Sequence, residues 1–406
     1  MKGTLTLADA VRLTGPAAFS LMLKPAGSLC NLDCAYCYYL DKADIYGGVE
    51  PRMSIEGLES FVKAYIEACE VPEVVFNWHG GEPCIMGLDF YRKAVDFEKK
   101  YAGGKTIKNT FQTNGTLLDD GWAKFFADED FLIGISVDGP AAIHDRYRKD
   151  KGGAPSFARV MRGVETLYRN KAQYNLMATV SHAGEGHGAE VYNFLKGLGT
   201  AFIQFSPVVE HVRYPSQEGL VARRMKNARP VIVDPRDPDA VLAPWSVSGL
   251  GFGTFLCDVF DSWLAAGDVG RVFVNWFDAT LANMCGVMPA TCSFAETCGG
   301  NAVVEHNGDF YCCDHFVYPQ YRIGNIFRDR LSDMMASPQQ TAFGIAKRNS
   351  LPGECLRCEF FALCHGGCPK HRFERRNYLC DGYRKFFRHT QKYFSAMRDD
   401  LIAGNP

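Results

Sequence analysis

The sequence predicts an α/β fold with parallel βα units in the first half, a small cysteine-rich domain after them, and a closing C-terminal helix. Two observations predict this order. In the first half, short apolar runs alternate with helix-like segments, a pattern typical of βα units around a parallel sheet. In the second half, eight candidate ligand cysteines lie between positions 292 and 380. In a reducing compartment such a group indicates metal binding.

Six apolar runs are the predicted strands of the first half. They are Ser20–Lys24, Val74–Trp78, Lys108–Thr113, Phe131–Val137, Asn175–Val180 and Ala201–Ser206. Helical patterns lie between them, for example over Ile55–Cys69 and Phe157–Asn170. In folds of this class, functional side chains are expected at or just after the C-terminal ends of the strands.

A stretch rich in proline and aspartate, from about Tyr214 to Pro244, predicts a connection or insertion between the two halves. It contains the densest basic run of the chain, which is Arg223, Arg224, Lys226 and Arg229. We interpret this run as a solvated loop face. After it, helices are predicted over Gly253–Ala266 and, at the end of the chain, over Tyr383–Ile402.

Composition argues against several classes of protein. The formal net charge is −2 and no long block of one sign exists, which disfavours a nucleic-acid-binding surface. No apolar stretch reaches the ~18 residues of a membrane span, and no run of signal-peptide length follows Met1. We therefore expect a cytoplasmic, reducing compartment, where 16 cysteines indicate metal sites rather than disulfides.

The most informative motif is a C-x3-C-x2-C run after the first predicted strand, made of Cys30, Cys34 and Cys37. Three thiolates at this spacing can wrap one loop around three irons of a 4Fe–4S cluster. The fourth iron then has no protein ligand, because the next cysteine is Cys69, and an open metal position is where chemistry takes place. A structural zinc loop, which is the alternative, requires a fourth ligand nearby.

The cysteines of the second half end in a C-x2-C-x5-C-x3-C run with Cys380 downstream. Eight thiolates can fill two closed four-cysteine sites, although spacing alone also allows zinc ribbons. An enzyme with one open iron–sulfur cluster can use further clusters to relay electrons, which favours iron–sulfur clusters over zinc at these sites. The remaining cysteines are interpreted as small buried hydrophobes: Cys69, Cys84, Cys257, Cys285 and Cys312.

Polar motifs follow three of the predicted strands. In HGGEP (79–83) the glycines allow the backbone to approach a ligand, and Glu82 can accept from an ammonium group. QTNG (112–115) and SVDGP (136–140) follow the next two strands, and Ser136 offers a hydroxyl suited to a ribose. Arg148 can bind a carboxylate through two parallel hydrogen bonds. Asn-Gly and Asp-Gly-Pro are also turn signals, so local geometry alone is the alternative.

The cysteine loop, with Tyr36 just before its last cysteine, resembles the radical S-adenosylmethionine (SAM) superfamily. The resemblance implies an open, partial (β/α)6 barrel, which six predicted units match better than a closed eightfold barrel. It also implies that SAM chelates the open iron through its amino and carboxylate groups, with the segment of Glu82 holding the amine. The implied SAM contacts are Tyr36, Gly81, Ser136 and Arg148, with Val209 near the adenine.

The second half resembles the twin-cluster SPASM domain of peptide-modifying radical SAM enzymes. Carried over, one cluster takes a first set of cysteines, Cys292, Cys298, Cys313 and Cys368. The other cluster takes a second set, Cys355, Cys358, Cys364 and Cys380. The expected cofactors are therefore SAM and three 4Fe–4S clusters. The expected domains are 1–240 (radical SAM partial barrel), 241–290 (linking helical segment), 291–382 (SPASM domain) and 383–406 (C-terminal helix).

From Leu21 to Tyr383 the chain resembles the anaerobic sulfatase-maturating enzymes. The matching stretches include KPAGSLCNLDCAYCYYL, NWHGGEP, SVDGPAAIHDRYRKD and NGDFYCCDHFVYPQYRIGNI. The resemblance implies oxidation of a cysteine or serine of a sulfatase to Cα-formylglycine. A 5′-deoxyadenosyl radical removes a Cβ hydrogen, a base removes a proton, and an electron leaves through the auxiliary clusters. The implied partners are an unfolded or nascent sulfatase chain as substrate and a flavodoxin- or ferredoxin-like electron donor.

The resemblance also implies a catalytic base. Asp314, directly after Cys313, matches the family position of the aspartate proposed as proton acceptor. Burial beside a cluster predicts that its pKa is raised towards the working range, and a turn-capping carboxylate is the alternative. His315 and His79 are alternative bases. One departure is Cys312, where the family often has proline.

Two other interpretations stay open at this stage. A twin-cluster relative could instead crosslink a ribosomal peptide through a thioether or carbon–carbon bond. Such relatives often carry an extra N-terminal peptide-binding domain, and the roughly 20 residues before the first strand are too few for one. A non-catalytic electron carrier or zinc scaffold leaves the open loop and HGGEP unexplained. The sequence does not distinguish a cysteine target from a serine target.

Overall fold

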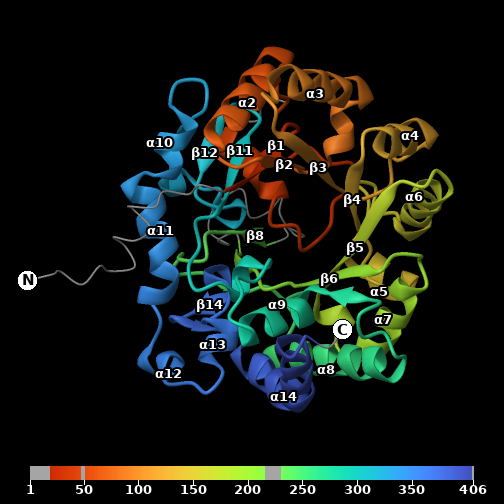
Figure 1. Ribbon diagram of the computed structural model, residues 1–406, viewed down its shortest axis with the longest axis vertical. Helices are drawn as coiled ribbons and strands as arrows, with labels where there is room; N and C mark the ends of the chain where they lie inside the picture. The colour runs from red at the N-terminus through yellow and green to blue at the C-terminus, as the bar shows by residue number, and fades with distance from the viewer. Residues whose placement is uncertain (1–18, 47–50, 215–229, 405–406) are drawn as a thin grey trace, which may run out of the picture.

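The computed structural model describes residues 19–46, 51–214 and 230–404. One ten-stranded sheet runs through it in the order β10-β6-β5-β4-β3-β2-β1-β11-β12-β13 (Figure 1). Its strands are β1 (Ser20–Lys24), β2 (Glu73–Trp78), β3 (Thr106–Thr113), β4 (Phe131–Ser136), β5 (Gln173–Val180), β6 (Phe202–Pro207), β10 (Phe273–Val274), β11 (Asn301–Glu305), β12 (Asp309–Tyr311) and β13 (Arg322–Asn325). Strands β1 to β6 pair in parallel, so their C-terminal ends meet at one edge.

The six predicted strands are these six parallel strands. β1 has the predicted bounds, and each end of the other five lies within two residues of its prediction. The sheet does not close on itself, because β10 lies beside β6 and β11 lies beside β1. This is the predicted open, partial (β/α)6 barrel, followed by the cysteine-rich segment and the closing helix.

Helices cover the outside of the curved sheet (Figure 1). The helices of the described residues are α2 (Ile55–Ala68), α3 (Leu88–Tyr101), α4 (Asp120–Asp128), α5 (Ala141–Tyr147), α6 (Phe157–Arg169), α7 (Gly188–Lys196), α8 (Gly249–Ala265), α9 (Asn275–Met284), α10 (Leu331–Met335), α11 (Pro338–Asn349), α12 (Gly353–Leu356), α13 (Phe361–Cys364) and α14 (Cys380–Ile402). The 3-10 turns are η1 (Leu40–Tyr46), η2 (Pro83–Met86), η3 (His182–Gly184), η4 (Cys292–Phe294), η5 (Asp314–Phe316), η6 (Pro319–Tyr321) and η7 (Pro369–His371).

The helices follow from local sequence signals. α2 begins after Ser54, whose Oγ accepts from Gly57 N at 3.1 Å, the usual N-cap bond. Its apolar face then buries Phe61 and Tyr65 against the sheet. The closing helix α14 packs on α8, with the rings of Phe394 and Phe260 5.2 Å apart. It begins at Cys380, three residues before the predicted start, so a second-set cysteine lies on its first turn.

The cysteine-rich segment extends the main sheet. β11 pairs in parallel with β1, and the register places Lys24 opposite Glu305. β12 and β13 then add antiparallel strands. The ends of β1 and β11 therefore lie at the same edge as the ends of the other barrel strands. The predicted domain boundaries stay predictions.

The described residues of the predicted connection between the halves include short strands. Its described ends contribute to a small sheet of β7 (His211–Arg213), β8 (Val231–Ile232) and β9 (Val241–Leu242). Ile232 of this sheet, together with Trp245, packs against the cysteine loop. The basic run at 223–229 lies outside the described residues. Two further strands, β14 (Arg372–Phe373) and β15 (Arg376–Asn377), form a hairpin. In the described part of the chain, no helix has both the length and the apolar character to cross a membrane.

Candidate active site

The cysteine loop follows β1 and is held against the HGGEP segment by backbone hydrogen bonds. Gly81 N donates to Gly27 O at 2.8 Å, and Glu82 N donates to Leu29 O at 2.7 Å. A Cβ on Gly81 would lie 2.1 Å from Leu29 O, so this approach requires glycine. The close approach that the sequence predicted for a ligand is made here to the cysteine loop itself.

The three thiols of the loop lie in a buried environment that suits a metal group. Leu32 N and Asn114 Nδ2 lie 3.4 Å and 3.7 Å from Cys30 Sγ. Burial, reinforced by the nearby Glu82 carboxylate, raises the pKa of Cys30 to about 12. Burial also raises the pKa of Cys34 and of Cys37. Such thiols ionise when a cation binds them, so this loop fits a bound cluster better than a free nucleophile.

Glu82 links three loops from a fully buried position. Its Oε1 accepts from Cys84 N at 3.0 Å and from Thr113 Oγ1 at 2.8 Å, and its Oε2 accepts from Asn114 N at 2.8 Å. Burial raises the pKa of this carboxyl, although these hydrogen bonds oppose the shift. The contacts show Glu82 holding the strand ends in place. Its contact with the SAM amine stays a prediction.

Arg148 and Tyr36 meet at Asp138, a residue that the sequence presented as a turn signal. Arg148 Nε donates to Asp138 Oδ2 at 2.9 Å and its Nη2 donates to Oδ1 at 3.0 Å, while the Tyr36 hydroxyl also donates to Oδ2. Thr179 N donates to Oδ1 at 2.9 Å. Burial alone would raise the pKa of Asp138, but the charges of Arg148 and His144, together with the hydrogen bonds from Arg148 and Tyr36, outweigh burial and lower the pKa. The fork expected to bind SAM is thus anchored on a protein carboxylate.

Two further predicted SAM contacts lie at strand ends. Ser136 ends β4, and its Oγ accepts from Gln112 Nε2 at 3.1 Å. Val209 follows β6 and is fully buried in the core. Both positions are at the edge where the cysteine loop lies, and their contacts with SAM stay predictions.

Asp314 opens η5, next to Cys313, and faces the end of β1. Its carboxylate accepts from the Tyr38 hydroxyl and forms an ion pair with Lys24 Nζ. Lys24 is fully buried, and its Nζ lies 3.3 Å from the centre of the Tyr39 ring. Since Tyr38 directly follows Cys37, Asp314 lies between the cysteine loop and the first set.

The expected pKa of Asp314 was wrong in direction. Burial alone would raise it, but Lys24, and then His79 and His315, outweigh burial and lower the pKa. The sequence does not show that Lys24, at the end of a distant strand, would lie beside this carboxyl. Burial lowers the pKa of His79 to about 4 and that of His315 to about 3. Both histidines are therefore neutral near pH 7, whereas Asp314 is anionic.

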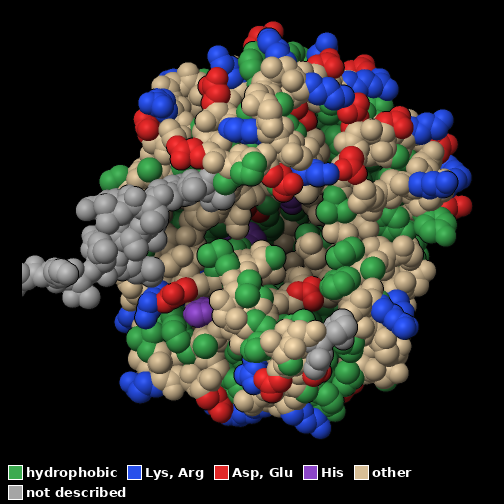
Figure 2. All heavy atoms as spheres, in the orientation of Figure 1, with side chains coloured by type: hydrophobic (Ala, Val, Ile, Leu, Met, Phe, Trp, Pro, Cys, Tyr) green, Lys and Arg blue, Asp and Glu red, His purple; other side chains and the backbone are tan. Residues whose placement is uncertain are grey.

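Further buried charges surround this group. Lys370 forms an ion pair with Glu210, and the Tyr39 hydroxyl donates to Glu305. Lys370 Nζ also lies 4.9 Å from the centre of the Tyr38 ring. Figure 2 shows the molecule hollowed at its centre, with histidine side chains visible inside. Sequence reasoning missed Lys24, Tyr38 and their neighbours. The available signals were a lone lysine at the end of an apolar strand and two tyrosines directly after a cluster cysteine.

The structure brings the first-set cysteines together. After burial, the charges of Cys368, Cys298 and Cys292 are the largest influences that raise the pKa of Cys313. Lys347 is buried beside them. It donates through Nζ to Cys292 O at 2.9 Å, to Ser293 O at 3.0 Å and to Ala295 O. Cysteines at the starts of η4, η5 and η7 thus lie near one another, and their binding of one cluster stays a prediction.

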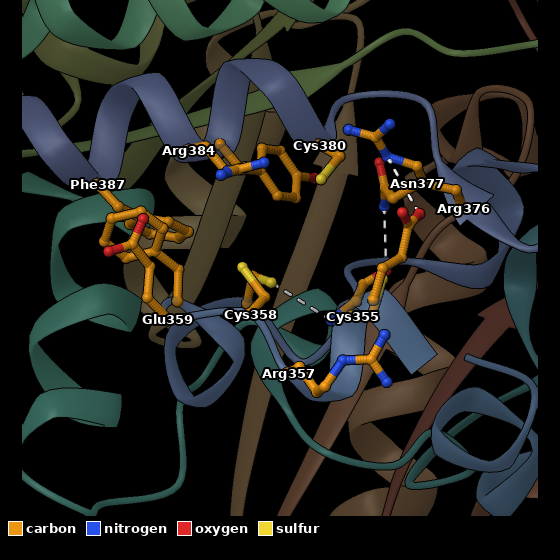
Figure 3. Close-up of a pocket in the computed structure, with 14 residues that line it drawn as sticks. Cys355, Arg357, Cys358, Glu359, Arg376, Asn377, Cys380, Arg384 and Phe387 are labelled. Atoms are coloured by element: carbon orange, nitrogen blue, oxygen red, sulfur yellow. Dashed lines mark hydrogen bonds and ion pairs between the residues drawn. The ribbon is translucent and has the colours of Figure 1, made fainter. Parts of the chain in front are cut away.

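The four second-set cysteines line a cavity of about 300 Å³. Figure 3 shows Cys358 and Cys380 pointing towards one another across it, the latter from the start of α14. Burial raises the pKa of Cys364 to about 11, and the other three thiolates of the set add to the shift. Among the described residues, no group of three or more Cys, His, Asp or Glu side chains is gathered closely enough to hold a single metal ion. The thiols surround a space instead.

The remaining cysteines fit the interpretation as small hydrophobes. Cys312 is 1% exposed and packs with Tyr311, Phe316 and Val317 in an apolar cluster. Burial raises its pKa to about 12, and no other thiol is among the causes. Cys69, Cys84 and Cys257 are also buried, and Cys285 is half-buried.

Comparisons with known proteins agree with this arrangement. The family model of the radical SAM superfamily matches residues 25–188, and that of the SPASM iron–sulfur cluster-binding domain matches residues 292–359. A serine-type anaerobic sulfatase-maturating enzyme of Bacteroides thetaiotaomicron is 44% identical over 94% of this chain and 92% of its own length. This chain belongs to the anaerobic sulfatase-maturating enzymes.

Other relatives extend the comparison within this family. A cysteine-type enzyme of Clostridium novyi is 32% identical over 91% of this chain and 94% of its own. The solved structure of native anSMEcpe with bound AdoMet has a TM-score of 0.80 at 30% identity, covering 94% of this chain and 99% of that one. Streptococcus suis SuiB bound to its precursor peptide SuiA, with a TM-score of 0.55 at 13% identity, shares the fold alone. The protein is a radical SAM enzyme of the anaerobic sulfatase-maturating type, and its cofactors are iron–sulfur clusters and SAM.

Proposed function

We propose that this enzyme oxidises a serine or cysteine side chain of a sulfatase to Cα-formylglycine. The observation that carries the proposal is the position of Asp314. It is adjacent to Cys313 of the first set and hydrogen-bonded to Tyr38, the residue after Cys37. A carboxylate at this point can take the proton of a target side chain where a hydrogen atom and an electron also leave. The 44% identity to a serine-type enzyme, against 32% to a cysteine-type one, favours serine as the better target.

The cysteines fit three 4Fe–4S clusters. Cys30, Cys34 and Cys37 would bind one cluster and leave an iron open for SAM, and the first and second sets would each bind a closed cluster. The cavity of about 300 Å³ within the second set supports a multi-iron group, since a single zinc ion draws its ligands to one point. When bound, the loop cluster and SAM supply the radical that removes a Cβ hydrogen, and the auxiliary clusters accept one electron.

The predicted SAM contacts are proposed with adjusted roles. Arg148 is anchored through Nε and Nη2 to Asp138, so its remaining edge would contact the SAM carboxylate. Tyr36 fixes the same carboxylate and would face SAM with its ring. The other proposed contacts are Gly81, Glu82, Ser136 and Val209.

The oxidation balances with Asp314 as the proton acceptor. The hydrogen atom taken from Cβ removes one proton and one electron from the target. The hydroxyl or thiol proton passes to an Asp314 carboxylate oxygen, and the second electron leaves. Serine then yields the aldehyde directly, whereas cysteine yields a thioaldehyde that takes up water and releases hydrogen sulfide. Before the proton arrives, Lys24 and Tyr38 keep the carboxylate in place and ionised.

Mass spectrometry of two model peptides tests this function. Peptides with an S-x-P-x-R or a C-x-P-x-R core are incubated with anaerobically reconstituted enzyme, SAM and dithionite. We expect an aldehyde on the target residue, 5′-deoxyadenosine in matching amount, and faster conversion of the serine peptide. Replacing dithionite by a reduced flavodoxin or ferredoxin tests the proposed donor. SAM cleavage that leaves both peptides intact would refute the maturase function in favour of a peptide-crosslinking one.

A further inference from the structure

Arg372 is a buried cation on the hairpin that connects the two auxiliary sites. The hairpin of β14 and β15 lies between Cys368 of the first set and Cys380 of the second set. Arg372 is 8% exposed, and its Nη1 donates to Ser350 Oγ at 2.9 Å. Its Nε and Nη2 are buried and have no hydrogen-bond partner among the described residues. Buried N–H groups without an acceptor are costly, so they point to an acceptor that a bound group supplies.

One of the two unpartnered nitrogens of the guanidinium lies close to the segment between the two sets of cysteines. Arg372 Nη2 lies 3.2 Å from the position that a Cβ on Gly366 would take. Gly366 stands between Cys364 of the second set and Cys368 of the first, and it also lines the cavity of the second set. The guanidinium therefore lies beside the short segment that carries one ligand of each set.

The charges agree with this placement. Cys368 and Cys298 of the first set act on Arg372, and so do Cys355 and Cys364 of the second set. This one cation thus interacts electrostatically with both sets.

Lys347 is the natural comparison, because it is also a buried cation beside cluster cysteines. Its Nζ donates to three backbone carbonyls of the η4 turn. An ammonium group has three N–H donors, so none is left for a sulfur atom. The thiolates that act on Lys347 are Cys298, Cys368 and Cys292, all from the first set. Lys347 thus holds a turn, whereas Arg372 keeps donors free between two sites.

We propose that Arg372 is a positioning residue shared by the two auxiliary clusters, donating its free N–H groups to sulfur atoms of both and raising both reduction potentials. The inference rests on the proposed function, which gives each set a 4Fe–4S cluster. A nearby positive charge and N–H···S bonds stabilise the reduced cluster, because it carries one more negative charge. A guanidinium suits this role, since its planar fork presents donors in two directions.

Redox titration followed by electron paramagnetic resonance tests the inference on the full-length, reconstituted protein. Replacing Cys30, Cys34 and Cys37 by alanine removes the loop cluster, so that the two auxiliary signals are observed alone. In this background, Arg372→Gln should make both auxiliary midpoint potentials more negative. Arg375→Gln is the matched control, because Arg375 is an exposed arginine of the same hairpin whose Nε donates to the backbone O of Ser350. The auxiliary midpoint potentials of this control should equal those of the protein that lacks only the three loop cysteines.

Each outcome decides the proposal. Unchanged potentials in Arg372→Gln, or a change in one cluster alone, would overturn the shared role. If Arg372→Gln fails to load iron, the midpoint potentials of Arg372→Lys are measured instead. Lysine keeps the positive charge but has fewer N–H donors, so both auxiliary potentials should become slightly more negative. Unshifted potentials in this variant would refute the proposal. Iron and sulfide analysis separates this inference from the proposed function. Fewer than two clusters in the background protein would contradict the cluster assignment itself, whereas two clusters with unmoved potentials would contradict only the role of Arg372.

Discussion

The Tyr36–Asp138–Arg148 group and the Tyr38–Asp314–Lys24 group contain the same three kinds of side chain. In each, a tyrosine of the cysteine loop and a buried cation hold a carboxylate. Asp138 receives four hydrogen bonds, including both from the Arg148 fork and one from Thr179 N. The described residues give Asp314 two partners, Tyr38 and Lys24.

The two carboxylates differ in how readily they can accept a further proton or hydrogen bond. The Asp138 side chain is 3% exposed, and its lone pairs are occupied by protein donors. The Asp314 side chain is 15% exposed and has room to accept a further proton or hydrogen bond. A planar, bidentate cation makes a rigid anchor, whereas an ammonium group leaves the carboxylate accessible. The same kinds of side chain thus produce a fixed support beside the predicted SAM site and a more accessible carboxylate, the proposed proton acceptor, beside the first set.

The largest expected effect is the loss of stability when the Asp138–Arg148 ion pair is broken. Asp138→Asn leaves Arg148 buried without its counter-charge, and we expect the free energy of unfolding to fall by about 3–5 kcal/mol. Urea denaturation of the anaerobic holoenzyme measures this. Asp120→Asn removes an exposed ion pair with Arg169 and should lower the free energy of unfolding far less, because exposed ion pairs contribute little to stability. Equal losses in the two variants would contradict the distinction.

Glu98 is a third buried carboxylate to compare with Asp138 and Asp314. It accepts a hydrogen bond from an amide, Asn109 Nδ2 at 2.8 Å, rather than from a cation. Burial raises its pKa to about 7. A raised pKa means that its contribution to stability is full below the unfolded value and is lost as the pH rises through 7. From pH 5 to 8 the wild-type protein should therefore lose about 3 kcal/mol relative to Glu98→Gln. Parallel stability profiles of the two proteins would refute this.

Asp314→Asn tests the proposed proton acceptor. Loss of a positioned base should slow formylglycine formation by about 100-fold or more, while SAM is still cleaved and the proposed clusters are still loaded. Asp261→Asn, which changes an exposed carboxylate on α8, is the matched control and should keep the wild-type rate. Wild-type product formation by Asp314→Asn would exclude this residue as the base.

The smallest effects separate the two tyrosines. Tyr36→Phe removes a hydrogen bond to a buried anion and should lower the free energy of unfolding by about 1.5–3 kcal/mol. Tyr38→Phe should cost less stability, because Asp314 is the more exposed carboxylate, but it should slow product formation more than SAM cleavage. Urea denaturation and peptide turnover of both variants measure the two effects. An identical pattern in both would mean that the two groups do not differ in role.

Local sequence predicted the barrel well and the electrostatics poorly. Fully buried residues alternate with partly buried ones along the parallel strands, which read in the sequence as mainly apolar runs such as Val74–Trp78, and their ends carry the predicted motifs. The pairing of β11 with β1 has no local signal, because register is set by tertiary packing. Lys24 and Asp314 meet only through that pairing. The pKa of Asp314 therefore could not be predicted in sign from its neighbours in sequence.

The pairing of β1 with β11 has a consequence for synthesis on the ribosome. Ser20 is among the first residues made in the described chain, and its partner Asn301 emerges much later, after roughly 15–60 s at typical translation rates. Until then β1 is an edge strand, and Lys24 has no Asp314 beside it. The cysteine loop and Asp314 are thus brought together by the last third of the chain. A truncated product would hold the cysteine loop without this carboxylate, and so without the proposed proton acceptor.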